Sequence, residues 1–164
     1  MKRVIVLGCS GSGKSTLARA MGERLGLPVH HLDSLFWTPG WKERPREEFR
    51  ALHDAVVAQD AWILDGNYTN VIETRLPRAD HVVFLDFRTA TCLRAILQRR
   101  FSRAPRPDMA EGCPEQLEPG FLWYVLTWNR IRRRRTQRLL AAHPELPVTR
   151  LRNRREVADF LAGL

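Results

Sequence analysis

The sequence predicts an α/β domain with a five-stranded parallel sheet flanked by helices. Five short segments along the chain are typical of strands, and the first, residues 3–7, is a continuous apolar run rich in β-branched residues, as in strands buried on both faces of a parallel sheet. Segments with a helical spacing of apolar residues lie between them, and this alternation builds parallel sheets with right-handed crossovers. At 164 residues, the chain is long enough for one domain, 1–164, and too short for two.

The expected strands are 3–7, 29–33, 62–64, 81–85 and 148–151. The expected helices are 15–25, 45–58, 70–76, 89–101, 121–142 and 156–161. In the first helix, Leu17, Met21 and Leu25 recur every four residues, and Gly26 with Pro28 ends it. An aromatic, turn-rich segment, SLFWTPGW, follows the second strand.

The composition is that of a folded protein without a membrane segment. The N-terminal apolar run 4–7 is shorter than the roughly 7–15 residues of a secretory signal core. No segment approaches the roughly 20 apolar residues that a membrane helix needs. Cys9, Cys92 and Cys113 are odd in number and far apart, so they form neither a disulfide framework nor a zinc-binding pair. We therefore expect a cytoplasmic protein with reduced thiols.

Residues 8–15 read GCSGSGKS and match the phosphate-binding pattern G-x-x-x-x-G-K-[ST] at every required position. Its glycines let successive backbone N–H groups point into one concavity, to which the next helix adds its positive N-terminus. Lys14 is expected to reach the β- and γ-phosphates of ATP, and the Ser15 hydroxyl to bind Mg²⁺. A glycine turn without a ligand is the less favoured alternative. The expected nucleotide-binding residues of this loop are Gly8, Ser10, Gly11, Ser12, Gly13, Lys14, Ser15 and Thr16.

Carboxylates end three of the expected strands. Asp33 and Asp65 follow the second and third strands, and ligands of parallel sheets bind beyond the carboxyl ends of the strands. We expect both acids to be catalytic, with Asp65 joining Ser15 as a Mg²⁺ ligand. The sequence leaves open which acid positions the metal and which the acceptor, and each could instead cap a helix. For Asp86, a helix-capping role is the preferred explanation, because a helix opens three residues later.

The segment 99–118 combines arginines with a proline-rich stretch. We expect a short lid here, because a phosphoryl-transfer site needs mobile cations that exclude water and neutralise the transferring phosphate. Arg99 and Arg103 are the expected catalytic cations of this lid. The alternative is a solvated, charged surface.

A second arginine cluster lies on the expected helix 121–142. Arg132 and Arg135 fall within its apolar stripe, and arginines are rarely buried without a partner. We therefore expect these two to face the nucleotide. The expected surface charges are Arg130, Arg133, Arg134 and Arg138.

These motifs resemble the adenylate-kinase-like P-loop phosphotransferases and, in detail, the small family of topology modulation proteins. The resemblance spans nearly the whole chain, through GCSGSGKSTLAR, LDSLFWTPGW, WILDGNY, SRAPRPDMAEGCPEQL and LRNRREVADFL. It implies a fold of the nucleoside monophosphate kinase type, with ATP and Mg²⁺ at the loop 8–15, an acceptor near Asp33 and Asp65, and a short lid.

One departure from the adenylate kinases concerns the acceptor. Those enzymes typically continue their Asp-Gly with a hydrophobic residue, proline and an arginine that grips the acceptor phosphate, whereas Asn67 and Tyr68 follow Gly66 here. Arg75 is a candidate substitute for that arginine. The departure argues against AMP as the acceptor.

Two functions remain. The first is an ATP-dependent kinase of a nucleotide or another small molecule. The second is a nucleic-acid-associated protein that uses the nucleotide as a switch, which the arginine-rich helix and the name of the topology modulation family would suit. The strand-end acids, the expected lid and the inward arginines favour the kinase. A signalling GTPase is set aside, because the chain lacks the Asn-Lys-x-Asp guanine signature.

Overall fold

A parallel sheet in the order β2-β5-β1-β6-β7 forms the centre of the computed structural model, which describes residues 1–101, 108–110, 112–113 and 118–164. Its strands are β1 (Arg3–Gly8), β2 (Val29–His31), β5 (Trp62–Asp65), β6 (His81–Leu85) and β7 (Val148–Leu151). All four neighbouring pairs are parallel. The predicted five-stranded α/β fold is confirmed.

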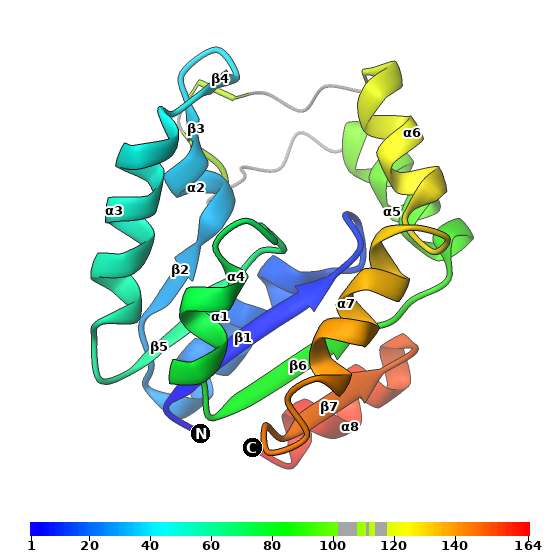
Figure 1. Cartoon of the computed structure of the whole chain (residues 1–164). Helices are drawn as coiled ribbons and strands as arrows, with labels where there is room; N and C mark the ends of the chain where they lie inside the picture. The colour runs from blue at the N-terminus through cyan, green and yellow to red at the C-terminus, as the bar shows by residue number, and fades with distance from the viewer. Residues whose placement is uncertain (102–107, 111, 114–117) are drawn as a thin grey trace.

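Helices cover both faces of this sheet (Figure 1). They are α1 (Lys14–Leu25), α2 (Leu32–Phe36), α3 (Arg46–Val57), α4 (Ile72–Arg75), the 3₁₀ turn η1 (Leu76–Arg78), α5 (Thr89–Phe101), α6 (Pro119–Thr127), α7 (Arg132–Ala141) and α8 (Arg154–Ala162). No helix in the described part of the chain is long and apolar enough to cross a membrane.

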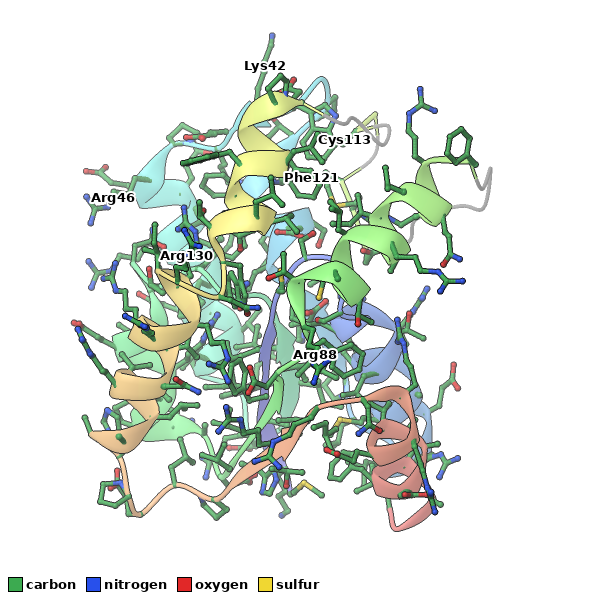
Figure 2. All side chains as sticks on the ribbon, turned by 90° about the vertical axis from the view of Figure 1, so that its right-hand side faces the viewer. Lys42, Arg46, Arg88, Cys113, Phe121 and Arg130 are labelled. Atoms are coloured by element: carbon green, nitrogen blue, oxygen red, sulfur yellow. The ribbon has the colours of Figure 1, made fainter. Side chains whose placement is uncertain are left out.

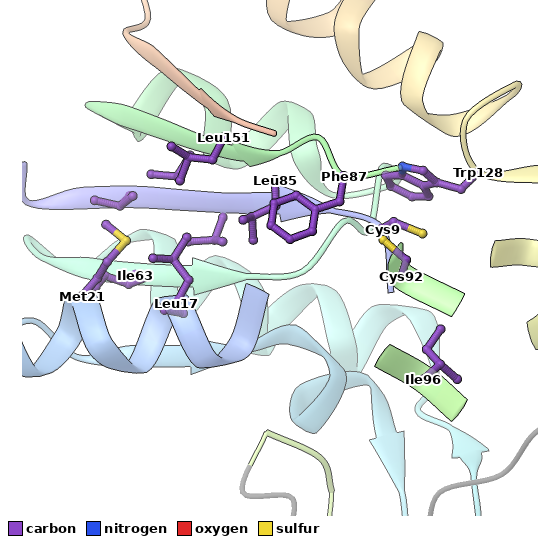
Figure 3. Close-up of a cluster of buried hydrophobic side chains, with 14 of the residues drawn as sticks. Cys9, Leu17, Met21, Ile63, Leu85, Phe87, Cys92, Ile96, Trp128 and Leu151 are labelled. Carbon is purple, nitrogen blue, oxygen red and sulfur yellow. The ribbon is translucent and has the colours of Figure 1, made fainter. Parts of the chain in front are cut away.

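Each face of the sheet has its own apolar core. On one face, side chains of α1, α5 and α6 pack with those of the strands, as the cluster around Leu17, Cys92 and Trp128 shows (Figure 3). On the other face, Phe49 of α3 and Leu140 of α7 pack against the strands. Burial from both sides explains why the central strands β1, β5 and β6 are nearly continuous apolar runs.

The predicted helix 121–142 is divided into α6 and α7. The two parts belong to different cores: Val125 and Trp128 pack on the face of α1, whereas Leu139 and Leu140 pack on the face of α3. A straight helix cannot serve both faces of a sheet, so the chain turns after Thr127. Neither glycine nor proline marks this turn. For this reason the sequence predicted one continuous helix.

The aromatic, turn-rich segment after β2 forms a short helix and a hairpin. Asp33 lies in α2 and not at the end of a strand, and a short antiparallel hairpin follows, formed by β3 (Trp37–Thr38) and β4 (Lys42–Glu43). The backbone N–H of Gly40 at its tip donates to the carbonyl of Gly112, 3.1 Å away. The hairpin thereby forms one side of the candidate active site.

Candidate active site

The phosphate-binding loop connects β1 to α1. Gly11 and Gly13 have φ angles of +81° and +93°, a region that side-chain-bearing residues rarely adopt. A Cβ atom on Gly11 would lie 2.4 Å from the carbonyl oxygen of Cys92. The Nζ atom of Lys14 donates to the carbonyl of Cys9 at 3.2 Å, so the lysine curls over the loop. This conformation is the one that the pattern of residues 8–15 predicts for a phosphate cradle.

Asn67 fixes the entrance of this loop. Its Oδ1 accepts a hydrogen bond from the N–H of Gly8 at 3.2 Å, and its Nδ2 donates to the carbonyl of Gly8 at 2.9 Å. The same Nδ2 lies 3.3 Å from the hydroxyl of Tyr124 on α6. Asn67 thus connects the loop to the end of β5 and to α6. Asn67 was not among the predicted site residues, although the departure from the adenylate kinase pattern at this position could have indicated its role.

A cavity of about 640 Å³ opens beside the loop, a volume typical of small-molecule sites. Of the predicted site residues in the described part of the chain, it brings together those of three regions: the loop, α2, and the arginines of α5 and α7. The predicted residues that line it are Ser10, Lys14, Asp33, Arg99, Arg132 and Arg135. Ser15 and Thr16 lie in the first turn of α1. Arg103 and most of the expected lid lie outside the described residues.

Asp33 is oriented by an aromatic neighbour. The hydroxyl of Tyr68 donates to its Oδ1 at 2.6 Å. Burial, reinforced by the negative charge of Asp33, raises the pKa of Tyr68. The phenol therefore keeps its proton at neutral pH and remains a donor, which holds one oxygen of the carboxylate in place.

Asp65 lies deeper than Asp33. Its side chain is 5% exposed, and its Oδ2 lies 2.9 Å from Nδ1 of His31. Its Oδ1 is buried without a hydrogen-bond partner among the described residues. A buried carboxylate oxygen usually has a partner, so Oδ1 is available to a cation or a bound water.

Arg75 lies away from the cavity. It is completely buried, and its Nη2 donates to the carbonyls of Gly66 at 2.6 Å and Asn67 at 2.8 Å. Burial lowers its pKa, and the charge of Asp65 opposes that shift. Arg75 therefore supports the turn after β5 and is not placed to grip an acceptor phosphate, contrary to the sequence-based suggestion.

The arginines of α7 differ from one another in their surroundings. The guanidinium of Arg132 lies 4.5 Å from the ring centroid of Tyr124, which lines the cavity. Arg133, expected on the surface, instead binds both oxygens of Asp86, at 2.5 and 2.9 Å. Arg150 donates to the same carboxylate at 2.6 Å. The role of Asp86 is thus ion pairing and not the expected helix capping. Both arginine partners are far along the chain from Asp86, and no sequence pattern indicated the pairing.

This ion-pair group predicts a pH-dependent stability. Burial raises the pKa of Asp86, but the hydrogen bonds and charges of Arg133 and Arg150 outweigh it, and the pKa falls below the usual 3.8. A carboxyl with a lower pKa in the folded state stabilises above its unfolded pKa, and this contribution is lost as the pH falls through the folded pKa. We expect Asp86→Asn to lower the free energy of unfolding by about 1–3 kcal/mol at neutral pH.

Urea denaturation at pH 7 and at about pH 3 tests this, because the deficit of the variant should shrink as the stabilising charge is titrated. Asp60→Asn serves as the control, since Asp60 is exposed. An equal effect of both substitutions, or a deficit of Asp86→Asn that stays constant with pH, would contradict the assignment.

Two proteins of related sequence are both distant from the chain. No protein-family model matches the chain. It is 27% identical over 143 residues to human tRNA dimethylallyltransferase, covering 87% of this chain and 28% of that protein. It is also 27% identical over 132 residues to the uncharacterized protein YqaC of Bacillus subtilis, covering 78% and 73%. The chain thus spans little more than a quarter of the human protein.

Solved structures resemble the chain over its whole length. A shikimate kinase of Acinetobacter baumannii in complex with shikimate has a TM-score of 0.65 at 16% identity, covering 99% of this chain and 90% of that chain. A shikimate kinase of Bacteroides thetaiotaomicron has a TM-score of 0.58 at 18% identity, covering 99% and 95%. The chain has the fold of P-loop kinases. A putative kinase of Chloroflexus aurantiacus agrees, with a TM-score of 0.57 at 17% identity, covering 98% and 94%. The finer resemblance to topology modulation proteins is not confirmed by these comparisons.

Proposed function

We propose that the protein is an ATP-dependent kinase that transfers the γ-phosphate of ATP to a hydroxyl group of a small molecule. One observation carries the proposal: a single cavity is lined by Lys14 of the phosphate-binding loop and by the carboxylate of Asp33. A phosphate held by the loop and a hydroxyl held by Asp33 would then meet in the same enclosed space. Phosphoryl transfer depends mainly on such positioning and on electrostatic stabilisation.

The roles of the residues follow from their positions. The N–H groups of the loop and Lys14 hold the β- and γ-phosphates. Asp33 accepts the proton of the attacking hydroxyl, while the new oxygen–phosphorus bond forms and the bond between the γ-phosphorus and the bridging oxygen of ADP breaks. Arg99, Arg132 and Arg135 neutralise the charge that spreads over the transferring phosphate. A contribution of Arg103 from a closing lid remains part of the proposal.

The residues present fit a magnesium ion that arrives with ATP. Oxygen atoms are the ligands that Mg²⁺ prefers, and it usually keeps several waters and phosphate oxygens. The described part of the chain contains no group of three His, Cys, Asp or Glu side chains that could hold a metal, which suits an ion held largely by the nucleotide. The Ser15 hydroxyl and the unpartnered Oδ1 of Asp65 are the oxygens that would hold it. Bound there, Mg²⁺ would supply positive charge to the phosphates.

A coupled assay of ADP release tests the proposal. The protein is given ATP, Mg²⁺ and panels of nucleoside monophosphates, nucleosides and small hydroxylated metabolites. We expect ADP release that depends on one class of acceptor and is matched by a phosphorylated product in mass spectra. Normal ATP binding without acceptor-dependent release in any panel would argue against a kinase.

The nucleic-acid alternative keeps one specific observation in its favour. Arg130, Arg134 and Arg138 are exposed, and Arg130 marks the junction of α6 and α7 on the side seen in Figure 2. The matched human relative bears the name of a tRNA-modifying enzyme. The arginines that line the cavity point instead to a small-molecule site, so we rank this function second.

Salt dependence separates the two functions. A nucleic-acid surface loses affinity steeply with salt, with a slope of roughly −0.9 per phosphate contact in a plot of log K against log salt. We expect any duplex or tRNA affinity to vanish at physiological salt, while ATP binding changes little. Submicromolar nucleic-acid binding at that salt, weakened by Arg134→Glu with Arg138→Glu, would favour the alternative. Arg133→Glu is unsuitable for this test because it would break the ion pair with Asp86.

A further inference from the structure

Four aromatic side chains form one side of the cavity, and we call them the aromatic wall: Phe36, Trp37, Trp41 and Tyr68. Their rings contact one another. The ring centroids of Phe36 and Trp37 are 4.9 Å apart, those of Trp37 and Trp41 are 5.3 Å apart, and those of Phe36 and Tyr68 are 5.1 Å apart. Three of the four come from α2 and the hairpin that follows it, so one segment supplies most of the wall.

The wall is only partly covered by the protein itself. Trp62, which packs in the core, is 0% exposed, whereas Trp37 and Trp41 remain partly exposed and line the cavity. A pair of partly exposed tryptophans that faces a cavity offers flat apolar surface to a ligand.

Backbone strain is concentrated in the same wall. Among the described residues other than glycine, only Trp41 and Tyr68 have positive φ angles, of 59° and 24°. For bulky residues such angles are unfavourable, and they persist where the surrounding structure holds them, often at ligand sites. The Gly40–Gly112 hydrogen bond and a bond from Thr38 Oγ1 to the carbonyl of Lys42 hold the hairpin that carries Trp41.

The wall is joined to the proposed chemistry by a hydrogen bond. Tyr68 belongs to the wall and donates to Asp33, the acid that would accept the proton of the acceptor. A ligand whose body lies on the wall can therefore place a hydroxyl group next to this carboxylate, in the cavity that Lys14 also lines. A ligand that combines a flat ring with a hydroxyl group would thus fit this geometry.

We propose that the acceptor is an alcohol that carries a planar heteroaromatic ring, called an aromatic alcohol below, and that Trp37 and Trp41 determine this specificity by stacking on the ring. This inference rests on the proposed kinase function. Stacking of one heteroaromatic ring on an aromatic side chain corresponds to roughly 5- to 150-fold in affinity. Saturated polyols of similar size lack the flat face and bind more weakly.

Equilibrium binding, measured by calorimetry with Mg²⁺ and a non-hydrolysable ATP analogue, tests the inference without any turnover. The probes are adenosine, uridine and pyridoxine as aromatic alcohols, the two 5′-monophosphates of those nucleosides, and shikimate and inositol as saturated alcohols. We expect at least one aromatic alcohol to bind about 10-fold or more tightly than both saturated probes. The nucleosides, their monophosphates and pyridoxine distinguish the sources of the shared ring and hydroxyl.

The matched variants are Trp41→Asn, Trp37→Asn and, as control, Trp123→Asn. Asparagine tolerates a positive φ, so Trp41→Asn removes the ring without adding strain. Trp123 is 69% exposed on α6 and does not line the cavity. We expect the first two to weaken binding of the aromatic probe about 10-fold or more, with ATP affinity and melting temperature close to wild type, and Trp123→Asn to change nothing.

Shikimate or inositol binding as tightly as every aromatic probe, or no aromatic probe binding while the ATP analogue binds normally, would overturn the inference. Equal effects of Trp41→Asn and Trp123→Asn would do the same. None of these results would contradict the kinase proposal, which the ADP-release assay tests. Stacking of an aromatic probe without ADP release in any panel would leave the wall as a ligand site and refute the kinase.

Discussion

Lys14→Ala is expected to lower phosphotransfer to below roughly 1% of wild type, the scale of one lost charge-stabilising group at such a site. The only hydrogen bond of its Nζ in the described structure is to the carbonyl of Cys9, at the surface of the loop. Its removal should therefore spare the fold while the transferring phosphate loses its nearest cation. The measurements are kcat/KM for the accepted substrate and the melting temperature.

Lys42→Ala is the matched control for this prediction. Lys42 is exposed on β4 and does not line the cavity, so its loss should leave kcat/KM within about two-fold of wild type, as is usual for surface substitutions. Phosphotransfer above roughly 1% in Lys14→Ala would mean that the loop binds phosphate without taking part in the reaction.

The loop could be predicted from the sequence because its determinants are local. Eight consecutive residues fix the turn, the phosphate cradle and the start of α1, and the apolar run 4–7 of β1 comes directly before them. The order of the strands in the sheet has a different origin. It depends on contacts such as that between β1 and β6, which are far apart along the chain, and it was expected only through the resemblance to P-loop phosphotransferases.

The other side of the site could not be predicted because its determinants are distant in sequence. Asp86 meets Arg133 and Arg150 only after β6 and β7 pair and α7 packs beside them. The burial of Arg75 depends on the turn after β5. Five arginines within residues 130–135 look alike in the sequence, yet the turn after α6 sends some to the cavity, one to an ion pair and others to the surface.

The aromatic wall could not be predicted from the composition of the segment that supplies it. Proline and glycine at 39 and 40 predict a turn, and the sequence gives no sign that the residues beside it pair as strands. In the structure those residues form the tip of a hairpin, and the flanking tryptophans become part of a cavity that residues of α2, α5, α6 and α7 also line. A turn-rich segment to which no site residue beyond Asp33 was assigned thus supplies the side chains from which acceptor specificity is inferred.

Asp33→Asn is expected to lower kcat by about 10²- to 10⁴-fold, the usual contribution of a general base, with little change in ATP affinity. An asparagine keeps the size of the side chain and can still accept from Tyr68, so the variant removes the basic oxygen while keeping its surroundings. A group that acts mainly in the transition state affects kcat more than ground-state binding.

Two companion variants separate catalysis from positioning and from metal binding. Tyr68→Phe removes the hydroxyl that orients Asp33, and we expect a loss of about 10-fold in kcat, the scale of one hydrogen bond. Asp65→Asn should raise the Mg²⁺ concentration needed for half-maximal rate, because the buried Oδ1 is the proposed metal ligand. If Asp33→Asn and Asp65→Asn both turned over normally at every Mg²⁺ concentration, the two acids would be structural, and the site would consist of the phosphate-binding loop and the arginines alone.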